Sequence, residues 1–307
     1  MSLAATWSFD AIGTRWQIDT AAPLGTGVRA EVDALIDRFD REWSRFRSDS
    51  LVTALSAGGE VDAPADAADM LGAFVALSEA TSGAVNPLVG ASLAHRGYDA
   101  DYSFVDRGAL PAPERWHDLL TWTDATLRLA APGIIDVGAL GKGRLVDLVA
   151  DLLVERSGTP LVVDASGDIA VRGGAERIAL EHPFDPSKAI GVWEVTDGAL
   201  CASAVNRRVW GLGLVLGAAL GDPLGAPVGS GGLHHVLDAR TGEPVRTYAA
   251  TWAVAPTAMS ADALATALFF DGGPELAARW GAQWVRMSTD GRLEWSAGCR
   301  ADLFVRR

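Results

Sequence analysis

The stretch Asp136-Val137-Gly138-Ala139-Leu140-Gly141-Lys142-Gly143 decides the fold around it. Ile134-Ile135-Asp136 leads into it and predicts a strand, and an apolar stripe over residues 145–152 predicts a helix after it. Its glycines let the backbone approach a ligand closely, and the helix N-terminus that follows favours an anion such as phosphate. The pattern is neither the P-loop nor the dinucleotide fingerprint, so an ordinary turn before a helix is the competing interpretation.

Lys142 favours the phosphate interpretation. Of the 26 basic residues in the chain, only Lys142 and Lys188 are lysine, and the rest are arginine. A lysine kept between two glycines indicates that a compact ammonium is needed in a narrow place, because a planar guanidinium takes more room.

The composition is that of a globular protein, with 49% hydrophobic and 21% charged residues in a chain of 307. The net charge of −13 and the pI near 4.8 argue against a nucleic-acid or anionic-membrane surface, since both need clustered Lys and Arg. We expect no membrane segment and a cytoplasmic location, because no leader pattern and no apolar run of about 18 residues is found. Cys201 and Cys299 are too few for a disulfide framework and are expected to be reduced.

Helical and strand patterns are mixed along the chain without a regular βαβ rhythm. Strands are predicted at residues 6–9 and 16–19 around a turn at Gly13-Thr14, and at 127–129, 161–163, 178–180, 192–195 and 233–237. Apolar stripes predict helices over 28–43 and 70–77, and a late helix is predicted to start after Ser260 as its N-cap. The predicted fold class is therefore α+β, a mostly antiparallel mixed sheet with packed helices.

Asp262 and Thr266 lie one turn apart on the late helix and so share one face of it. A carboxylate and a hydroxyl together suit Mg²⁺, which takes hard oxygen ligands and completes its shell with phosphates and water. The competing interpretation is that the macrodipole alone favours an acidic residue in the first turn of a helix.

Two adjacent histidines, His234 and His235, fall in the predicted strand at 233–237. Neighbouring residues of a strand point to opposite faces, so only one histidine can face a given site. That histidine could carry a proton near neutral pH, although either ring could equally be a buried structural residue.

Taken in order, these segments resemble the ApbE family of FAD:protein FMN transferases over almost the whole chain. The matching segments are Gly13-Thr14, Ser44-Arg45-Phe46 with Ser50, Asn86-Pro87, Gly97-Tyr98-Asp99, Asp136 to Gly143, Gly167-Asp168-Ile169, His235 to Gly242 and Ala261 to Thr266. The resemblance implies a single ApbE-like domain over residues 1–307. This domain could consist of two subdomains that flank an FAD cleft.

The resemblance also implies a Mg²⁺ ion held by the Asp262 carboxylate, the Thr266 hydroxyl and the Ala139 carbonyl. Asp262 and His235 would be the catalytic residues, with His235 in proton transfer. The residues implied in binding the FAD substrate are Lys142 at the pyrophosphate, and Gly13, Thr14, Asp168 and Arg240 along the cleft. A threonine of an acceptor protein would attack the FMN-side phosphorus, so that AMP leaves and FMN stays in phosphoester linkage.

The chain departs from the family pattern at a few positions. Ser166 and Ala204 stand where the family has glycine, and Asn86 stands where it has aspartate. These changes leave the implied metal ligands intact. A side chain in place of glycine beside the flat flavin ring would narrow the flavin site or shift the position of the flavin. Two other functions stay open: a metal-dependent FAD pyrophosphatase that uses water in place of threonine, and a non-enzymatic FAD-binding or carrier protein.

Overall fold

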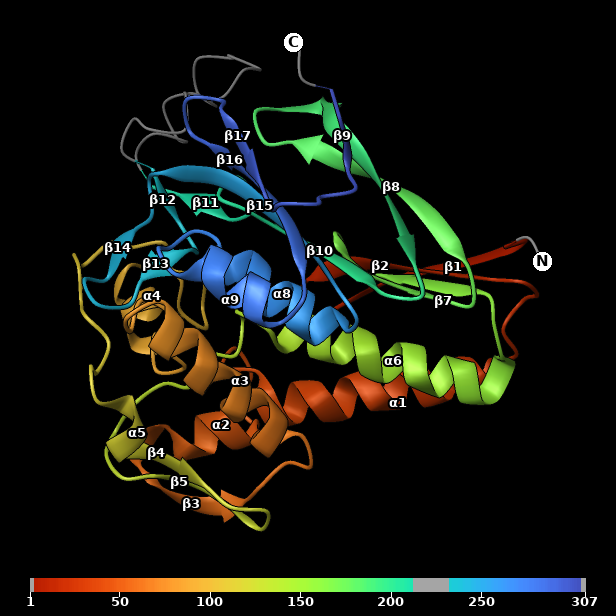
Figure 1. The fold of residues 1–307 in the computed structure, drawn as a ribbon. Coiled ribbons are helices and arrows are strands. Elements are labelled where there is room, and N and C mark those ends of the chain that lie inside the picture. Colours follow the sequence, from red (N-terminus) through yellow and green to blue (C-terminus); the bar gives the residue numbers. More distant parts are fainter. Residues whose placement is uncertain (1–2, 212–231, 305–307) are drawn as a thin grey trace.

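The computed structural model describes residues 3–211 and 232–304. An eight-stranded sheet in the order β1-β2-β6-β7-β10-β15-β16-β17 dominates it, and each neighbouring pair is antiparallel (Figure 1). Its strands are β1 (Ala5–Ala11), β2 (Thr14–Thr20), β6 (Leu161–Asp164), β7 (Asp168–Arg172), β10 (Ala199–Ala204), β15 (Tyr248–Ala255), β16 (Gln283–Ser288) and β17 (Leu293–Trp295). The α+β class and the mostly antiparallel sheet are confirmed.

Helices cover one face of this sheet. They are α6 (Gly141–Ser157) and α8 (Ala258–Ala267), with α1 (Thr26–Trp43) packed against α6 and α9 (Gly273–Arg279) against α8 (Figure 1). The predicted helical stripe of α1 is buried at Val32, Ile36, Phe39 and Trp43. Because these apolar side chains point toward the sheet side, the main hydrophobic core lies between the helices and the sheet.

A second, smaller sheet covers the opposite face. It contains β8 (Ala175–His182), β9 (Asp185–Thr196) and β18 (Asp302–Leu303) in the order β18-β9-β8. Trp193 of β9 is 1% exposed and belongs to a second core, which also holds Leu200 and Trp252 of the large sheet. The large sheet is therefore buried on both faces in this region, which fixes the positions of the strands that carry site residues.

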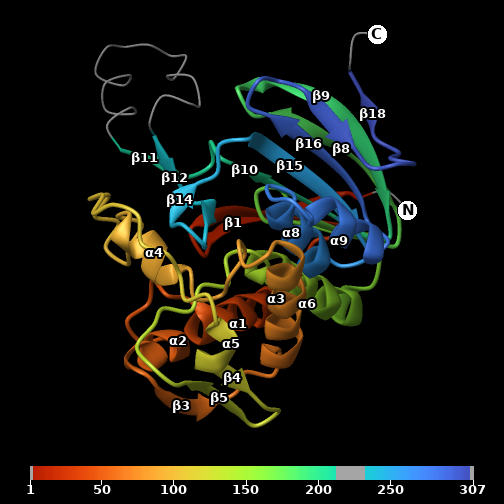
Figure 2. The ribbon, with the colours of Figure 1, turned by 60° about the vertical axis from the view of Figure 1, so that its left-hand side comes forward.

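The remaining elements extend the helical side away from the large sheet (Figure 2). The helices there are α2 (Leu51–Ala54), the 3₁₀ turn η1 (Leu55–Ala57), α3 (Ala67–Ala80), α4 (Gly90–His95) and α5 (Trp116–Leu119). The strands β3 (Gly59–Asp62), β4 (Leu120–Trp122) and β5 (Thr126–Leu129) form a sheet in the order β3-β5-β4. Short strand pairs follow: β11 (Val209–Trp210) with β12 (Leu233–His234), and β13 (Leu237–Asp238) with β14 (Glu243–Pro244).

Two strand predictions were wrong. Residues 134–136 form no strand, because their backbone meets no neighbouring strand and only the Asp136 amide is tied down, to the carbonyl of Pro87. The strand predicted at 233–237 is broken at His235, so that β12 and β13 pair with different partners. Ile135 and Val236 are buried without a β ladder, and a short apolar run by itself does not distinguish that situation from a strand.

Within residues 3–211 and 232–304, no helix is both long and apolar enough to cross a membrane. Cys201 and Cys299 are both free, as expected.

Candidate active site

A cavity of about 870 Å³ opens among the β1–β2 turn, the C-terminal end of α1, the start of α6 and helix α8. Seven residues implicated by the sequence line it together: Gly13, Thr14, Ala139, Lys142, His235, Asp262 and Thr266. Asp168 lies behind Lys142 and does not line the cavity. Arg240 is exposed and pairs with Asp238, outside the cavity lining.

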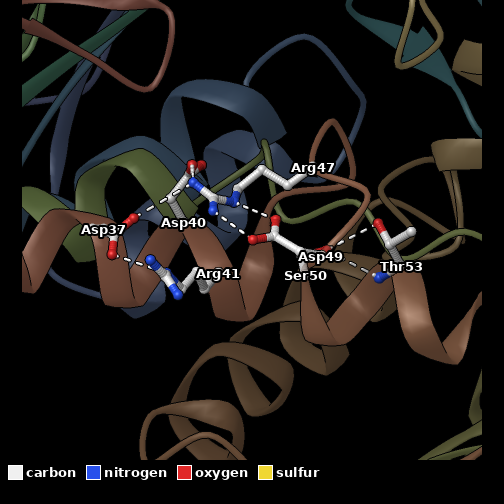
Figure 3. A network of polar contacts seen from close by, with 7 residues as sticks. All are labelled: Asp37, Asp40, Arg41, Arg47, Asp49, Ser50 and Thr53. Atoms are coloured by element: carbon white, nitrogen blue, oxygen red, sulfur yellow. Dashed lines mark hydrogen bonds and ion pairs between the residues drawn. The ribbon is translucent and has the colours of Figure 1, made fainter.

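The wall formed by α1 is held by a polar network (Figure 3). Arg47 donates to the cavity-lining carboxylate of Asp40 at 3.1 Å and binds both carboxylate oxygens of Asp49 at 2.8 Å. Ser50 then caps α2 by accepting the backbone N–H of Thr53. This network ties the end of α1 to the start of α2, and so fixes one side of the cavity.

The turn before α6 is held by Asp136. One oxygen of its carboxylate accepts the Gly138 N–H at 2.8 Å, and the other accepts a hydrogen bond from the buried guanidinium of Arg45. The turn leaves the Ala139 carbonyl pointing at α8, where it accepts a hydrogen bond from the Thr266 hydroxyl at 3.2 Å. The two oxygens implied as metal ligands are thus neighbours, although 127 residues separate them in sequence.

Helix α8 begins earlier than predicted. Thr257, and not Ser260, is its N-cap, because the Thr257 hydroxyl accepts the Ser260 N–H. The carboxylate of Asp147 on α6 adds a second cap by accepting the amides of Ala258 and Met259 at 2.9 and 2.8 Å. With the helix starting at Ala258, Asp262 lies beyond the first turn, which holds no acidic residue. The macrodipole explanation of Asp262 therefore fails.

Helices α6 and α8 touch at Gly143. Its amide donates to the Asp262 carboxylate at 2.9 Å. A Cβ atom at position 143 would lie 2.2 Å from the Ala258 carbonyl oxygen and 2.7 Å from the Asp262 Cβ. Only glycine lets the two backbones approach this closely, so Gly143 sets the distance between the Lys142 turn and the Asp262 side chain.

The charge of Lys142 is balanced by the carboxylate of Asp168, a residue that the family resemblance implied along the FAD cleft. The Lys142 ammonium lies 2.6 Å from the Asp168 carboxylate, which is only 1% exposed. Burial by itself would lower the pKa of Lys142, but Asp168 and Asp262 outweigh it and raise that pKa. Burial, reinforced by Asp168, raises the pKa of Asp262 well above its usual value. When ionised, the three groups carry one net negative charge, which attracts a cation.

The donor atoms fit Mg²⁺. In the described residues no group of three or more His, Cys, Asp or Glu side chains could hold a metal, so any metal at this cavity needs other ligands. Asp262, the Thr266 hydroxyl and the Ala139 carbonyl supply three hard oxygens. Adjacent ligands of an octahedral Mg²⁺ with bonds of about 2.0–2.1 Å lie about 2.9 Å apart, close to the 3.2 Å between the Thr266 and Ala139 oxygens.

The two histidines have separate environments, despite the break in the strand. His234 is 4% exposed, and its Nε2 bonds the Val245 carbonyl at 2.9 Å. His235 lines the cavity, and the buried Nδ1 atoms of both histidines have no hydrogen-bond partner among the described residues. Burial lowers the pKa of each histidine to about 4, and at His235 the neighbouring His234 and Lys142 contribute to this shift. Both rings are therefore neutral at pH 7, and His235 is in the form that accepts a proton.

Burial of His234 should make stability depend on pH. An unfolded imidazole binds a proton near pH 6.5 and folded His234 only near pH 4, so this contribution is complete above pH 6.5 and is lost as pH falls toward 4. Between pH 7.5 and 5 the wild type should lose about 2 kcal/mol more unfolding free energy than His234→Gln. Urea unfolding at a series of pH values measures this difference. Equal losses in both proteins would contradict it.

The sequence model of the ApbE family matches residues 12–286. The chain belongs to this family. Two curated relatives are the FAD:protein FMN transferases of Haemophilus influenzae, 26% identical over 265 residues (78% of this chain, 71% of that protein), and of Rhodobacter capsulatus, 26% identical over 319 residues (96% and 58%). The solved ApbE protein of Thermotoga maritima has a TM-score of 0.79 at 20% identity and covers 96% of this chain and 97% of that one. The flavin transferase ApbE from Vibrio cholerae has a TM-score of 0.75 at 20% identity, covering 95% and 96%. The resemblance seen in the sequence is confirmed, and these structures share the fold.

One departure from the ApbE pattern has a structural explanation. Ser166 has φ of +57°, the left-handed region that glycine adopts without strain. Its hydroxyl donates to the Arg15 carbonyl at 2.8 Å, which offsets that strain and ties β2 to the loop before β7. Ser166 and Ala204 both line the cavity, so both replacements of glycine narrow the space available to a ligand in this ApbE protein.

Two residues of this ApbE site were missed in the sequence. Asp147 looked like one more polar residue on α6, and Arg208 followed Arg207 in an unremarked Arg-Arg pair. Asp147 caps α8, and Arg208 lines the cavity. A buried carboxylate on an otherwise apolar helix face would have pointed to Asp147, whereas no local pattern distinguishes Arg208 from Arg207.

Proposed function

We propose that this protein is a Mg²⁺-dependent FAD:protein FMN transferase. It would cleave FAD, attach FMN through a phosphoester to a threonine of an acceptor protein, and release AMP. The observation that carries the proposal is the convergence of Asp262, Thr266, the Ala139 carbonyl and Lys142 on one cavity. Its 870 Å³ falls within the range of about 300–1,000 Å³ typical of ligand pockets.

The relatives agree with this chemistry. Curated proteins from Haemophilus influenzae, Rhodobacter capsulatus and Treponema pallidum that match 78–96% of this chain carry the name FAD:protein FMN transferase. Membership of the ApbE family gives the proposal its substrate, FAD, and its second partner, an acceptor protein. The acceptor threonine and the cytoplasmic location are predictions.

In this proposal, Asp262, Thr266 and Ala139 would hold Mg²⁺. When bound, the ion supplies positive charge to the non-bridging oxygens of the pyrophosphate and stabilises the charge that develops during phosphoryl transfer. Lys142, whose charge is balanced by its ion pair with Asp168, would contact the pyrophosphate from the cavity wall as a hydrogen-bond donor. The acidic net charge of the whole chain matters less than these groups because they act at short range.

His235 would accept the proton of the attacking threonine hydroxyl. Its ring is neutral at pH 7, its Nδ1 has no partner among the described residues, and it borders the cavity. A neutral imidazole carries one ring nitrogen with a free lone pair, which can accept a proton. His234, bonded to the Val245 carbonyl, does not line the cavity and holds β12 in place.

The test is incubation of the purified protein with FAD and Mg²⁺, with and without the acceptor protein of the Haemophilus influenzae relative. We expect AMP release that requires the acceptor, and an acceptor mass that increases by FMN less one water. Release of AMP and FMN at the same rate without an acceptor would identify an FAD pyrophosphatase instead. Recovery of intact FAD in both reactions would identify an FAD-binding or carrier protein.

A further inference from the structure

Arg208 differs from the other basic residues that line the cavity. Lys142 pairs with Asp168 at 2.6 Å, Arg207 with Glu181 at 3.2 Å, and Arg15 weakly with Asp10 at 3.7 Å. Arg208 has no carboxylate partner among the residues that the structure describes. Within the described residues its guanidinium donates one hydrogen bond, to the carbonyl oxygen of Gly13 at 2.6 Å.

The backbone carbonyl of Gly13 holds this guanidinium by a hydrogen bond. Gly13 forms the β1–β2 turn with φ of +73°, a conformation that side chains rarely adopt. A Cβ atom there would lie 3.4 Å from the Arg208 Nη2, an ordinary van der Waals contact, so the positive φ and not the space is what favours glycine. The hydrogen bond joins residues 195 positions apart, both of which line the cavity.

The surroundings of Arg208 place its charge at the proposed reaction centre. Burial is the main cause of the low pKa of His235, and the charges of Lys142 and Arg208 lower that pKa further, whereas a backbone hydrogen bond with Arg208 opposes the shift. The charge of Arg208 also opposes the rise in the pKa of Tyr98 that burial causes. Both residues line the cavity, so the guanidinium acts on the same space as the proposed proton acceptor.

A charge balance shows what is missing. Lys142, Asp168 and Asp262 together carry one net negative charge when ionised, so Lys142 alone gives no net attraction for an anion. The diphosphate of FAD is dianionic and needs positive charge beyond a metal ion. A guanidinium has five N–H donors in a rigid fork that matches two phosphate oxygens, and within residues 3–211 and 232–304 only one of them is used, by the Gly13 carbonyl.

We propose that Arg208, which lines the same cavity as Asp262, binds the non-bridging phosphate oxygens of FAD. The inference rests on the proposed function for the identity of the ligand. It makes Arg208 a substrate-binding residue that recognises phosphate and not the flavin ring. Gly13 is then a positioning residue, because it acts through Arg208.

The test compares three ligands that differ in phosphate content: riboflavin with none, FMN with one and FAD with two. Their affinities for wild type, Arg208→Gln and Arg207→Gln are measured by flavin fluorescence in EDTA, where no turnover occurs. Arg208→Gln should weaken FMN and FAD by about tenfold or more and leave riboflavin unchanged. Arg207→Gln is the matched control, because this adjacent arginine pairs with Glu181, and it should leave the ratio of FAD to riboflavin affinity unchanged. Arg208→Lys should retain part of the FAD affinity because it keeps the charge without the fork.

Three results would overturn the inference. One is unchanged affinity of Arg208→Gln for FMN and FAD. Another is an equal loss for riboflavin, which would mean that Arg208 shapes the ring site. The third is unchanged FAD affinity with a raised KM for the acceptor, which would assign the anion to the acceptor protein. Binding and turnover are measured separately, so a protein that binds FAD through Arg208 and leaves it intact would contradict only the proposed function.

Discussion

Asp262→Asn is expected to abolish Mg²⁺-dependent FAD cleavage while the protein stays folded. The change keeps the size of the side chain and an oxygen that can accept the Gly143 amide, but it removes the only charged side chain among the three proposed ligands. Loss of that ligand should lower turnover at least about a thousandfold, equivalent to roughly 4 kcal/mol of transition-state stabilisation. AMP release and acceptor flavinylation, measured over a Mg²⁺ titration, give this number.

The same substitution, Asp262→Asn, should not lower the thermal stability of the metal-free protein. Burial and the nearby Asp168 raise the pKa of Asp262, so in the metal-free protein its charge is unfavourable and Asn removes that cost. The melting temperature of metal-free Asp262→Asn should therefore equal or exceed that of the wild type. Added Mg²⁺ should raise the melting temperature of the wild type alone, because a ligand stabilises only the protein that binds it. A variant that turns over normally, or one that gains as much from Mg²⁺ as the wild type, would remove Asp262 from the metal site.

Gly143→Ala should have the second large effect. The added methyl meets the Ala258 carbonyl oxygen at 2.2 Å and the Asp262 Cβ at 2.7 Å, and neither can move without shifting helix α8. We expect at least about 2 kcal/mol of lost unfolding free energy from this overpacking. Activity should fall by about a hundredfold in the fraction that remains folded, because a shift of about 1 Å misaligns Asp262 and Thr266 with the turn at Ala139.

Gly72→Ala is the matched control for this change. Gly72 is also inside a helix, α3, but it is exposed, and apart from its chain neighbours and the backbone of its own helix no heavy atom lies within 4 Å of the position that its Cβ would take. There the substitution should stabilise the protein by about 0.5–1 kcal/mol and leave turnover unchanged. Chemical unfolding and turnover assays of the two variants separate helix propensity from the close approach of α6 and α8. Similar effects of the two substitutions would show that Gly143 sets no distance.

The sequence by itself determined the elements whose signals are local. Spacing patterns within short segments predicted four elements: the N-terminal hairpin, helices α1 and α3, and the helix that follows the Asp136 to Gly143 stretch. They could be predicted because the apolar residues in each recur with the period of the element and lie on its buried face. The glycines between Asp136 and Gly143 also indicated a turn whose backbone can approach a ligand closely. The ApbE resemblance added seven of the residues that line the cavity, since motif order carries over between relatives even at low identity, although Asp168 and Arg240 lie outside its lining.

The tertiary structure decided what these residues do to one another. It paired Lys142 with Asp168, moved the start of α8 to Ala258, and brought Gly13 to Arg208. The physical reason is that charge balance and close packing depend on which groups lie within a few ångströms. The contacts that determine charge balance and packing in the site join residues far apart in sequence. Gly143 and Asp262 are 119 positions apart, and Gly13 and Arg208 are 195 positions apart. No local period encodes such distances, which exist only once the sheet and the helices have packed.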